Sequence, residues 1–140
     1  MPSVCNQKGS VLLLIVFLIF FLALFVISIS DLTTTDFQIA RNNKLLTMAF
    51  YVAEAGIERS IYELRQNNSW SAGFNQVQFP TGENSYYTVT VTNPSSVFVT
   101  LDSTGTVQDD FKRRIIVKLK VLPTSVPYPI IINSWEEAAP

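Results

Sequence analysis

The sequence predicts an α+β fold: a long N-terminal helix, first transmembrane and then amphipathic, packed on a small antiparallel β-sheet. Two observations favour this fold. An unbroken apolar run fills residues 11–27, and no proline or glycine follows it until Gly56. From residue 86 onward the pattern changes to a period-two alternation rich in β-branched and aromatic residues, which is typical of strands.

Composition limits the chemistry that the chain can carry. Its 140 residues include no histidine and a single cysteine, Cys5, which excludes an internal disulfide, a Cys-rich zinc site and a histidine general base. The serines, Ser10 among them, have no evident base beside them. The net charge of −1 gives no electrostatic reason to expect a nucleic-acid partner. We therefore expect a protein that is not an enzyme, binds no cofactor and has no nucleic-acid partner.

Two adjacent acidic pairs, Asp109-Asp110 and Glu136-Glu137, have the oxygen ligands that calcium accepts. No loop of spaced Asp and Gly residues surrounds either pair, so we interpret each as a solvated turn or tail and predict no metal site. Tyr86, Tyr87 and Trp135 could form a binding surface, but packing in the core or at an edge explains all three.

The apolar run is long enough to cross a membrane, because roughly 20 uncharged residues in a helix span about 30 Å. Three interpretations of the amino end fit it. Ser28-Ile29-Ser30 could close a cleaved signal peptide, the run could be an uncleaved single-pass anchor, or residues 1–9 could be a prepilin leader ending in Lys8-Gly9. Since Lys8 precedes the run and Asp31 is the first charge after it, the amino terminus is expected on the cytoplasmic side.

The helix is expected to continue from a transmembrane half, residues 10–30, into an amphipathic half, residues 31–67. One apolar stripe recurs there every three or four residues: Leu46, Phe50, Ala53, Ile57, Ile61 and Leu64. Thr33–Thr35 are weak helix formers, so the segment is either one helix of about 55 residues or two stacked pieces. Asn67-Asn68-Ser69 is expected to end it.

Two small residues lie near this stripe, Ala53 and Gly56. Three positions apart on a helix, they would let a sheet or a neighbouring helix approach closely. The alternative is that both are ordinary small residues of the core.

The rest of the chain, residues 68–140, is expected to be an extracytoplasmic antiparallel β-sheet domain. A polar loop through Gly73 and Gly82 comes first. Four strands are predicted, at residues 86–92, 97–107, 114–121 and, as a short edge strand, 130–135. Turn residues separate the first three strands, and Gly105 is interpreted as a β-bulge. One face of the third long strand is apolar and should meet the helix, while the other should meet water.

Residues 6–14 look like the end of a prepilin leader followed by the start of a mature pilin. Residues 49–58, which contain Ala53-Glu54-Ala55-Gly56-Ile57-Glu58, are similar to a segment of PilX-type minor pilins, and residues 103–107 and 114–117 look like the paired strands of that family. The chain thus resembles a type IV pilin-like protein of the PilX-type minor pilin family, over nearly its whole length.

The resemblance implies that prepilin peptidase cuts between Gly9 and Ser10 and methylates the new amino group of Ser10. Cys5 would leave with the leader, residues 1–9. The apolar helix would hold the subunit in the inner membrane, with its carboxyl-terminal domain outside the cytoplasm, and would then pack among neighbouring helices in a pilus or pseudopilus. The implied partners are other pilin-like subunits, prepilin peptidase, the lipid bilayer and a tip adhesin.

Leu14 departs from the family pattern. Most pilins carry Glu as the fifth mature residue, where it pairs with a neighbour's amino terminus, and a buried carboxylate is retained where a partner charge offsets its cost. The resemblance therefore implies a minor, priming or tip subunit that assembles through its helix, at positions such as Leu14, Ala53 and Gly56. Two alternatives remain: a single-pass anchored extracytoplasmic binding module outside any filament, and a tip pseudopilin of type II secretion.

Overall fold

The computed structural model describes residues 5–94 and 97–139 of the chain. Within them a helix, α1 (Cys5–Gln66), precedes five strands in an α+β arrangement, which confirms the predicted fold class. The strands are β1 (Phe74–Gln78), β2 (Ser85–Thr92), β3 (Phe98–Val107), β4 (Phe111–Val121) and β5 (Ile130–Ala138). Residues 1–4 of the predicted leader and Ser95-Ser96 of the first predicted turn lie outside the described residues.

The chain divides into two compact units, residues 1–42 and 43–140, and the boundary falls inside α1. The described part of the first unit is helix throughout. The second unit contains the end of α1 and the whole sheet.

The helix α1 is continuous over 62 residues and passes through Thr33–Thr35, where two stacked pieces were the alternative. No proline or glycine lies near these threonines to interrupt it, and the hydroxyls of two of them are bonded within the helix. The Thr33 hydroxyl donates to the Ile29 carbonyl at 2.9 Å, and the Thr34 hydroxyl donates to the Ser30 carbonyl at 3.0 Å. Each hydroxyl thus shares a carbonyl one turn back with the helix backbone. Such a bond gives the hydroxyl a partner but does not strengthen the helix.

The helix ends where the asparagines predict. The Asn67 amide donates to the Glu63 carbonyl at 2.9 Å, and the Asn67 side-chain oxygen accepts from the Ser69 amide at 3.0 Å. The Trp70 amide then donates to the Asn67 carbonyl at 3.0 Å, so the chain turns toward the sheet. These bonds satisfy groups that the helix end leaves without intrahelical partners.

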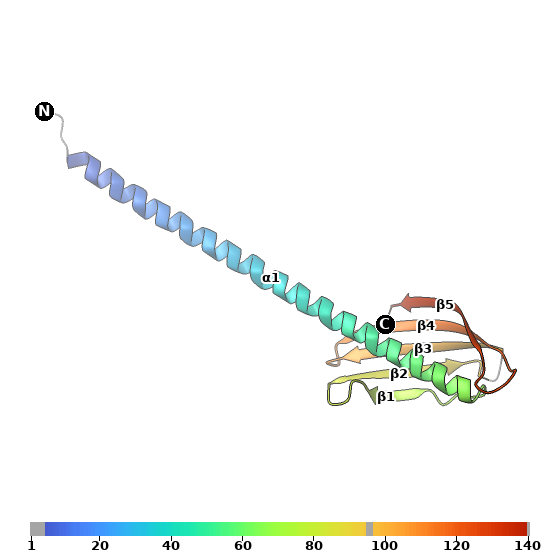
Figure 1. Cartoon of the computed structure of the whole chain (residues 1–140). Coiled ribbons are helices and arrows are strands. Elements are labelled where there is room, and N and C mark those ends of the chain that lie inside the picture. The colour runs from blue at the N-terminus through green and yellow to red at the C-terminus, as the bar shows by residue number, and fades with distance from the viewer. Residues whose placement is uncertain (1–4, 95–96, 140) are drawn as a thin grey trace. The chain divides into compact units, whose positions relative to one another are not determined.

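The sheet is an antiparallel meander whose strand order, β1-β2-β3-β4-β5, is also the order along the chain (Figure 1). The four predicted strands are present, and β5 extends three residues beyond the predicted end at residue 135. The strand β1 lies inside the stretch that was predicted to be a polar loop, so that prediction is wrong. Only Phe74 and Val77 are apolar there, and because they are three positions apart they do not show the period-two alternation of a strand. A register shift lies between them, and Gln76 within it has a φ of 47°.

The predicted bulge at Gly105 is also wrong. The pairing of β3 with β2 and with β4 runs through Gly105 without a register shift. The helix, rather than a bulge, accounts for this glycine, as its contacts show below.

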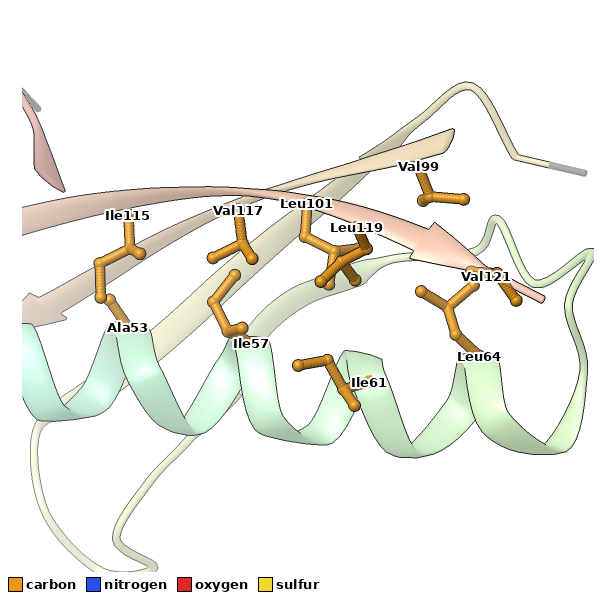
Figure 2. Close-up of a cluster of buried hydrophobic side chains, with 10 residues drawn as sticks. All are labelled: Ala53, Ile57, Ile61, Leu64, Val99, Leu101, Ile115, Val117, Leu119 and Val121. Atoms are coloured by element: carbon orange, nitrogen blue, oxygen red, sulfur yellow. The ribbon is translucent and has the colours of Figure 1, made fainter. Parts of the chain in front are cut away.

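The core lies between the end of α1 and one face of the sheet. Figure 2 shows the side chains of α1 pointing at those of β3 and β4 across this layer. Its larger cluster is Ala53, Ile57, Ile61, Leu64, Val99, Leu101, Ile115, Val117, Leu119 and Val121. A second cluster on the β2 side is Leu45, Ala49, Val52, Tyr87, Val89 and Val107. The helix therefore buries a wider face than the predicted stripe, in which Leu46 and Phe50 prove only half-buried.

Candidate membrane anchor and helix–sheet contact

The apolar side chains of residues 11–27 of α1 are not buried by any other described part of their own unit. Every residue from 9 to 30 is exposed, and the large apolar side chains between Val11 and Ile29 keep from 47% to 73% of their surface accessible. So large a continuous apolar surface needs a non-aqueous environment or a partner. By length and composition this helix can cross a membrane, and it is compatible with single-pass anchoring.

The hydroxyl groups at the end of the run are already satisfied. The Ser28 side chain donates to the Leu24 carbonyl at 3.0 Å, and the Ser30 side chain donates to the Val26 carbonyl at 3.1 Å. An unpaired hydroxyl in hydrocarbon is costly, so these bonds let both serines lie within a bilayer.

Three of the predicted site residues, Gly9, Ser10 and Leu14, lie on this exposed helix. Leu14 keeps 66% of its surface accessible. A Cβ built on Gly9 would meet no atom within 4 Å. Packing within the described chain therefore gives no reason for a glycine at that position.

The other two predicted residues, Ala53 and Gly56, lie in the second unit against the chain's own sheet. Ala53 is fully buried. A Cβ on Gly56 would lie 2.6 Å from the Ser103 hydroxyl oxygen, 2.9 Å from a methyl carbon of Val89 and 3.0 Å from a ring carbon of Tyr87. The close approach predicted for these two residues is made by β2 and β3.

The sheet contributes two small residues to the same contact, Ser103 and Gly105 of β3. A Cβ on Gly105 would lie 2.1 Å from the Ala49 carbonyl oxygen and 2.5 Å from the Ala53 amide nitrogen, so only glycine lets the strand backbone reach the helix backbone. The buried Ser103 hydroxyl donates to the Ala53 carbonyl at 2.7 Å. At Gly105 the backbone of β3 therefore lies directly against the backbone of α1, and the Ser103 hydrogen bond holds the two elements together there.

Sequence reasoning missed the role of Ser103 and Gly105. A signal was present, because the two residues are two positions apart and so share one face of a strand that otherwise buries large side chains on that face. Two small residues on the inward face of a strand indicate that the backbone of another element approaches closely there.

Charged groups of the sheet lie outside this contact and pair with one another. The Arg114 guanidinium donates two hydrogen bonds to the Asp102 carboxylate, at 2.9 and 2.5 Å, and this raises the pKa of Arg114 above its ordinary value. The Tyr86 hydroxyl donates to the Asp109 carboxylate at 3.0 Å, which raises the pKa of Tyr86. Burial likewise raises the pKa of Tyr87, which lies in the core.

The two acidic pairs hold different positions. Asp109-Asp110 forms the turn between β3 and β4, as predicted, whereas Glu136-Glu137 belongs to β5 and not to a tail. Glu137 pairs with Arg113 at 2.7 Å. Among the residues that the structure describes, no group of three or more His, Cys, Asp or Glu side chains could hold a metal ion.

Comparison with known proteins adds no relative: no protein-family model, no curated protein sequence and no solved structure matches the chain.

Proposed function

We propose that the chain is a minor pilin or pseudopilin, a subunit that inserts in the inner membrane and is processed by prepilin peptidase. It then takes part, as a priming or tip subunit, in the assembly of a type IV pilus or related filament. One observation carries the proposal. A single helix, α1, has an uncovered apolar half at residues 9–30 and continues without a break into a half built into a folded sheet.

An unbroken helix is more than a simple anchor requires. A tether needs only a spanning segment, and a flexible linker after it would serve. Here no proline or glycine occurs from Ser10 to Ala55, and α1 runs through Thr33–Thr35 without interruption. A continuous helix suits a subunit whose apolar half leaves lipid and packs among the helices of other subunits, which are the partners we propose.

Gly9 supports the processing step. It lies directly before the apolar run, next to Lys8, and no packing contact within the described chain demands it. A residue that the fold does not need is explained if a peptidase must admit the backbone on either side of the Gly9–Ser10 bond. Leu14 supports a minor role, since it lacks the carboxylate that would pair with a neighbour's amino terminus.

Mass spectrometry of the chain extracted from membranes tests the proposal. We expect a mature chain that begins at N-methylated Ser10. Gly9→Ala should block the cut and keep the chain out of filaments, yet leave it inserted in the membrane. Asn6→Ala, a substitution of the same leader that spares the cut bond, should be processed normally.

The same measurement separates the alternatives. A chain with Met1 retained would favour an anchored binding module outside any filament, and a chain that starts at Asp31 would indicate a cleaved signal peptide. Filaments that still contain the Gly9→Ala variant would show that the leader interpretation is wrong. The assembly to which a processed subunit belongs, pilus or type II secretion pseudopilus, follows from which filament contains it.

A further inference from the structure

The two edges of the sheet differ in how open they are to another strand. At one edge, β1 has five residues, a register shift and a residue in the left-handed region, Gln76. Short, irregular edge strands of this kind resist pairing with other chains. At the other edge, β5 has nine residues, and no strand of the described chain pairs with its outer side (Figure 1).

The strand β5 carries apolar side chains on both of its faces. Ile131 shares the face of Lys120, away from α1, and is 48% exposed. Ile132 and Trp135 share the faces of Leu119 and Val117, toward the helix side, and are 50% and 36% exposed. Exposed apolar residues on both faces of an edge strand are what a further strand would cover.

The charges of β5 lie at its other end. Glu136 and Glu137 fall on opposite faces, opposite Ile116 and Ile115 of β4. Arg113 pairs with Glu137 at 2.7 Å, whereas Glu136 forms no ion pair with any residue that the structure describes. An added strand would therefore meet an uncompensated carboxylate at this end.

The strand that already pairs with β5 shows how charge is placed along this edge. The strand β4 runs antiparallel to it, with Ile115 and Ile116 directly opposite the two carboxylates and Leu119-Lys120-Val121 opposite Ile130–Ile132. Three basic residues of β4 come just before these isoleucines, and the side chain of Arg113 reaches Glu137. A strand added on the outer side of β5 would lie beside Glu136, which has no ion pair in the described structure, and beside Ile131 and Ile132. The outer edge of β5 is therefore complementary to a strand with a basic residue near Glu136 and apolar residues near Ile131 and Ile132.

We propose that the outer edge of β5 binds an extended segment of a different protein, which adds antiparallel to β5 as a sixth strand. The segment carries Lys or Arg beside Glu136 and apolar residues beside Ile131 and Ile132. Backbone hydrogen bonds supply affinity, and the charge at one end sets direction and register. This inference stands apart from the filament proposal, because it uses only the sheet.

A second copy of the chain fits this edge less well. Two β5 strands paired antiparallel about Ser134 would place Glu136 of each against Ile132 of the other, without any charge partner. Paired in parallel and in register, they would place like carboxylates together, which is unfavourable. Charge complementarity thus favours a partner other than the chain itself.

A binding experiment on the full chain in detergent micelles tests the proposal. The probe is a synthetic peptide with the sequence of residues 111–121, which has the required basic and apolar ends. Its control is the same peptide N-methylated at alternate residues, which cannot donate backbone hydrogen bonds along one side. Two matched charge reversals are compared: Glu136→Lys on β5 and Glu58→Lys, which changes an exposed carboxylate on α1 and alters the net charge equally.

We expect the peptide to bind, the N-methylated peptide not to bind, and Glu136→Lys to weaken binding about three- to tenfold while Glu58→Lys leaves it unchanged. Amide hydrogen exchange should slow in β5 and stay unchanged in β4, which separates addition of a strand from displacement of β4. Equal binding by the two variants, binding of the N-methylated peptide, faster exchange in β4, or self-association of the chain through Glu136 would each overturn the proposal.

Discussion

A methyl group added at Gly105 should force the sheet away from the helix. Its Cβ would lie 2.1 Å from the Ala49 carbonyl oxygen and 2.5 Å from the Ala53 amide nitrogen, and both are backbone atoms of a continuous helix. Ordinary contact then requires β3 and α1 to separate by about 1 Å. Overpacking typically costs about 1–3 kcal/mol, and occasionally more, while replacing a strand glycine by alanine returns about 0.5–1 kcal/mol. Because backbone atoms cannot rotate away, we take the upper end of the overpacking cost, about 3 kcal/mol, and expect Gly105→Ala to lower the free energy of unfolding by about 2 kcal/mol after this offset.

Gly56→Ala is the matched comparison, because it makes the same chemical change in the same contact. Its Cβ would meet side-chain atoms of Ser103, Val89 and Tyr87, which can rotate, and alanine favours the helix. We expect a loss of about 0–2 kcal/mol. Denaturant unfolding of the full chain in micelles, followed by tryptophan fluorescence, measures both. If Gly105→Ala is no more destabilising than Gly56→Ala, the helix backbone is not the rigid surface that sets this distance.

Three further predictions concern single contacts of the sheet. Ser103→Ala removes a hydrogen bond to a helix carbonyl that keeps its intrahelical partner, so the free energy of unfolding should fall by about 1 kcal/mol, with unchanged secondary structure by circular dichroism. A double-mutant cycle of Asp102→Asn and Arg114→Gln should give a coupling of about 0.5–1 kcal/mol that shrinks in 1 M salt, because the pair is partly exposed; a salt-independent value would contradict this. The hydrogen bond to Asp109 raises the pKa of Tyr86. The stability that this hydrogen bond contributes is therefore fully present at pH values below the tyrosine's ordinary pKa, and it is lost as the pH rises through the raised pKa of the folded protein. Asp109→Asn should lower that pKa, as read by ultraviolet titration of the phenol, and an unchanged titration would show that the carboxylate is not the cause.

The features that local pattern determines could be predicted from the sequence. The helix end at Asn67, the strands β2 to β5 and the apolar inner face of β4 follow from cap chemistry and from period-two alternation. The continuity of α1 could not be predicted, because the low helix propensity of Thr33–Thr35 favours a break, whereas the absence of proline and glycine near them favours one helix. The long apolar half of α1 could be predicted because its signal is its length and composition alone.

The features that depend on tertiary contact escaped prediction for a physical reason. The strand β1 has little alternation of its own and is held by pairing with β2. Gly105 has the same sequence signature whether it forms a bulge or admits a helix, and only the register of β3 with its neighbours separates the two. For the candidate site, Ala53 and Gly56 could be identified as points of close approach, but the element that approaches them could not.

The order of the strands bears on how the sheet is made. Each strand pairs with the one synthesised just before it, so every hairpin can close as soon as its second strand leaves the ribosome, and none must be inserted late between two others. The helix is made first, and its apolar stripe stays uncovered until β3 and β4 emerge. In the interval between those two events the stripe is open to contacts with other chains.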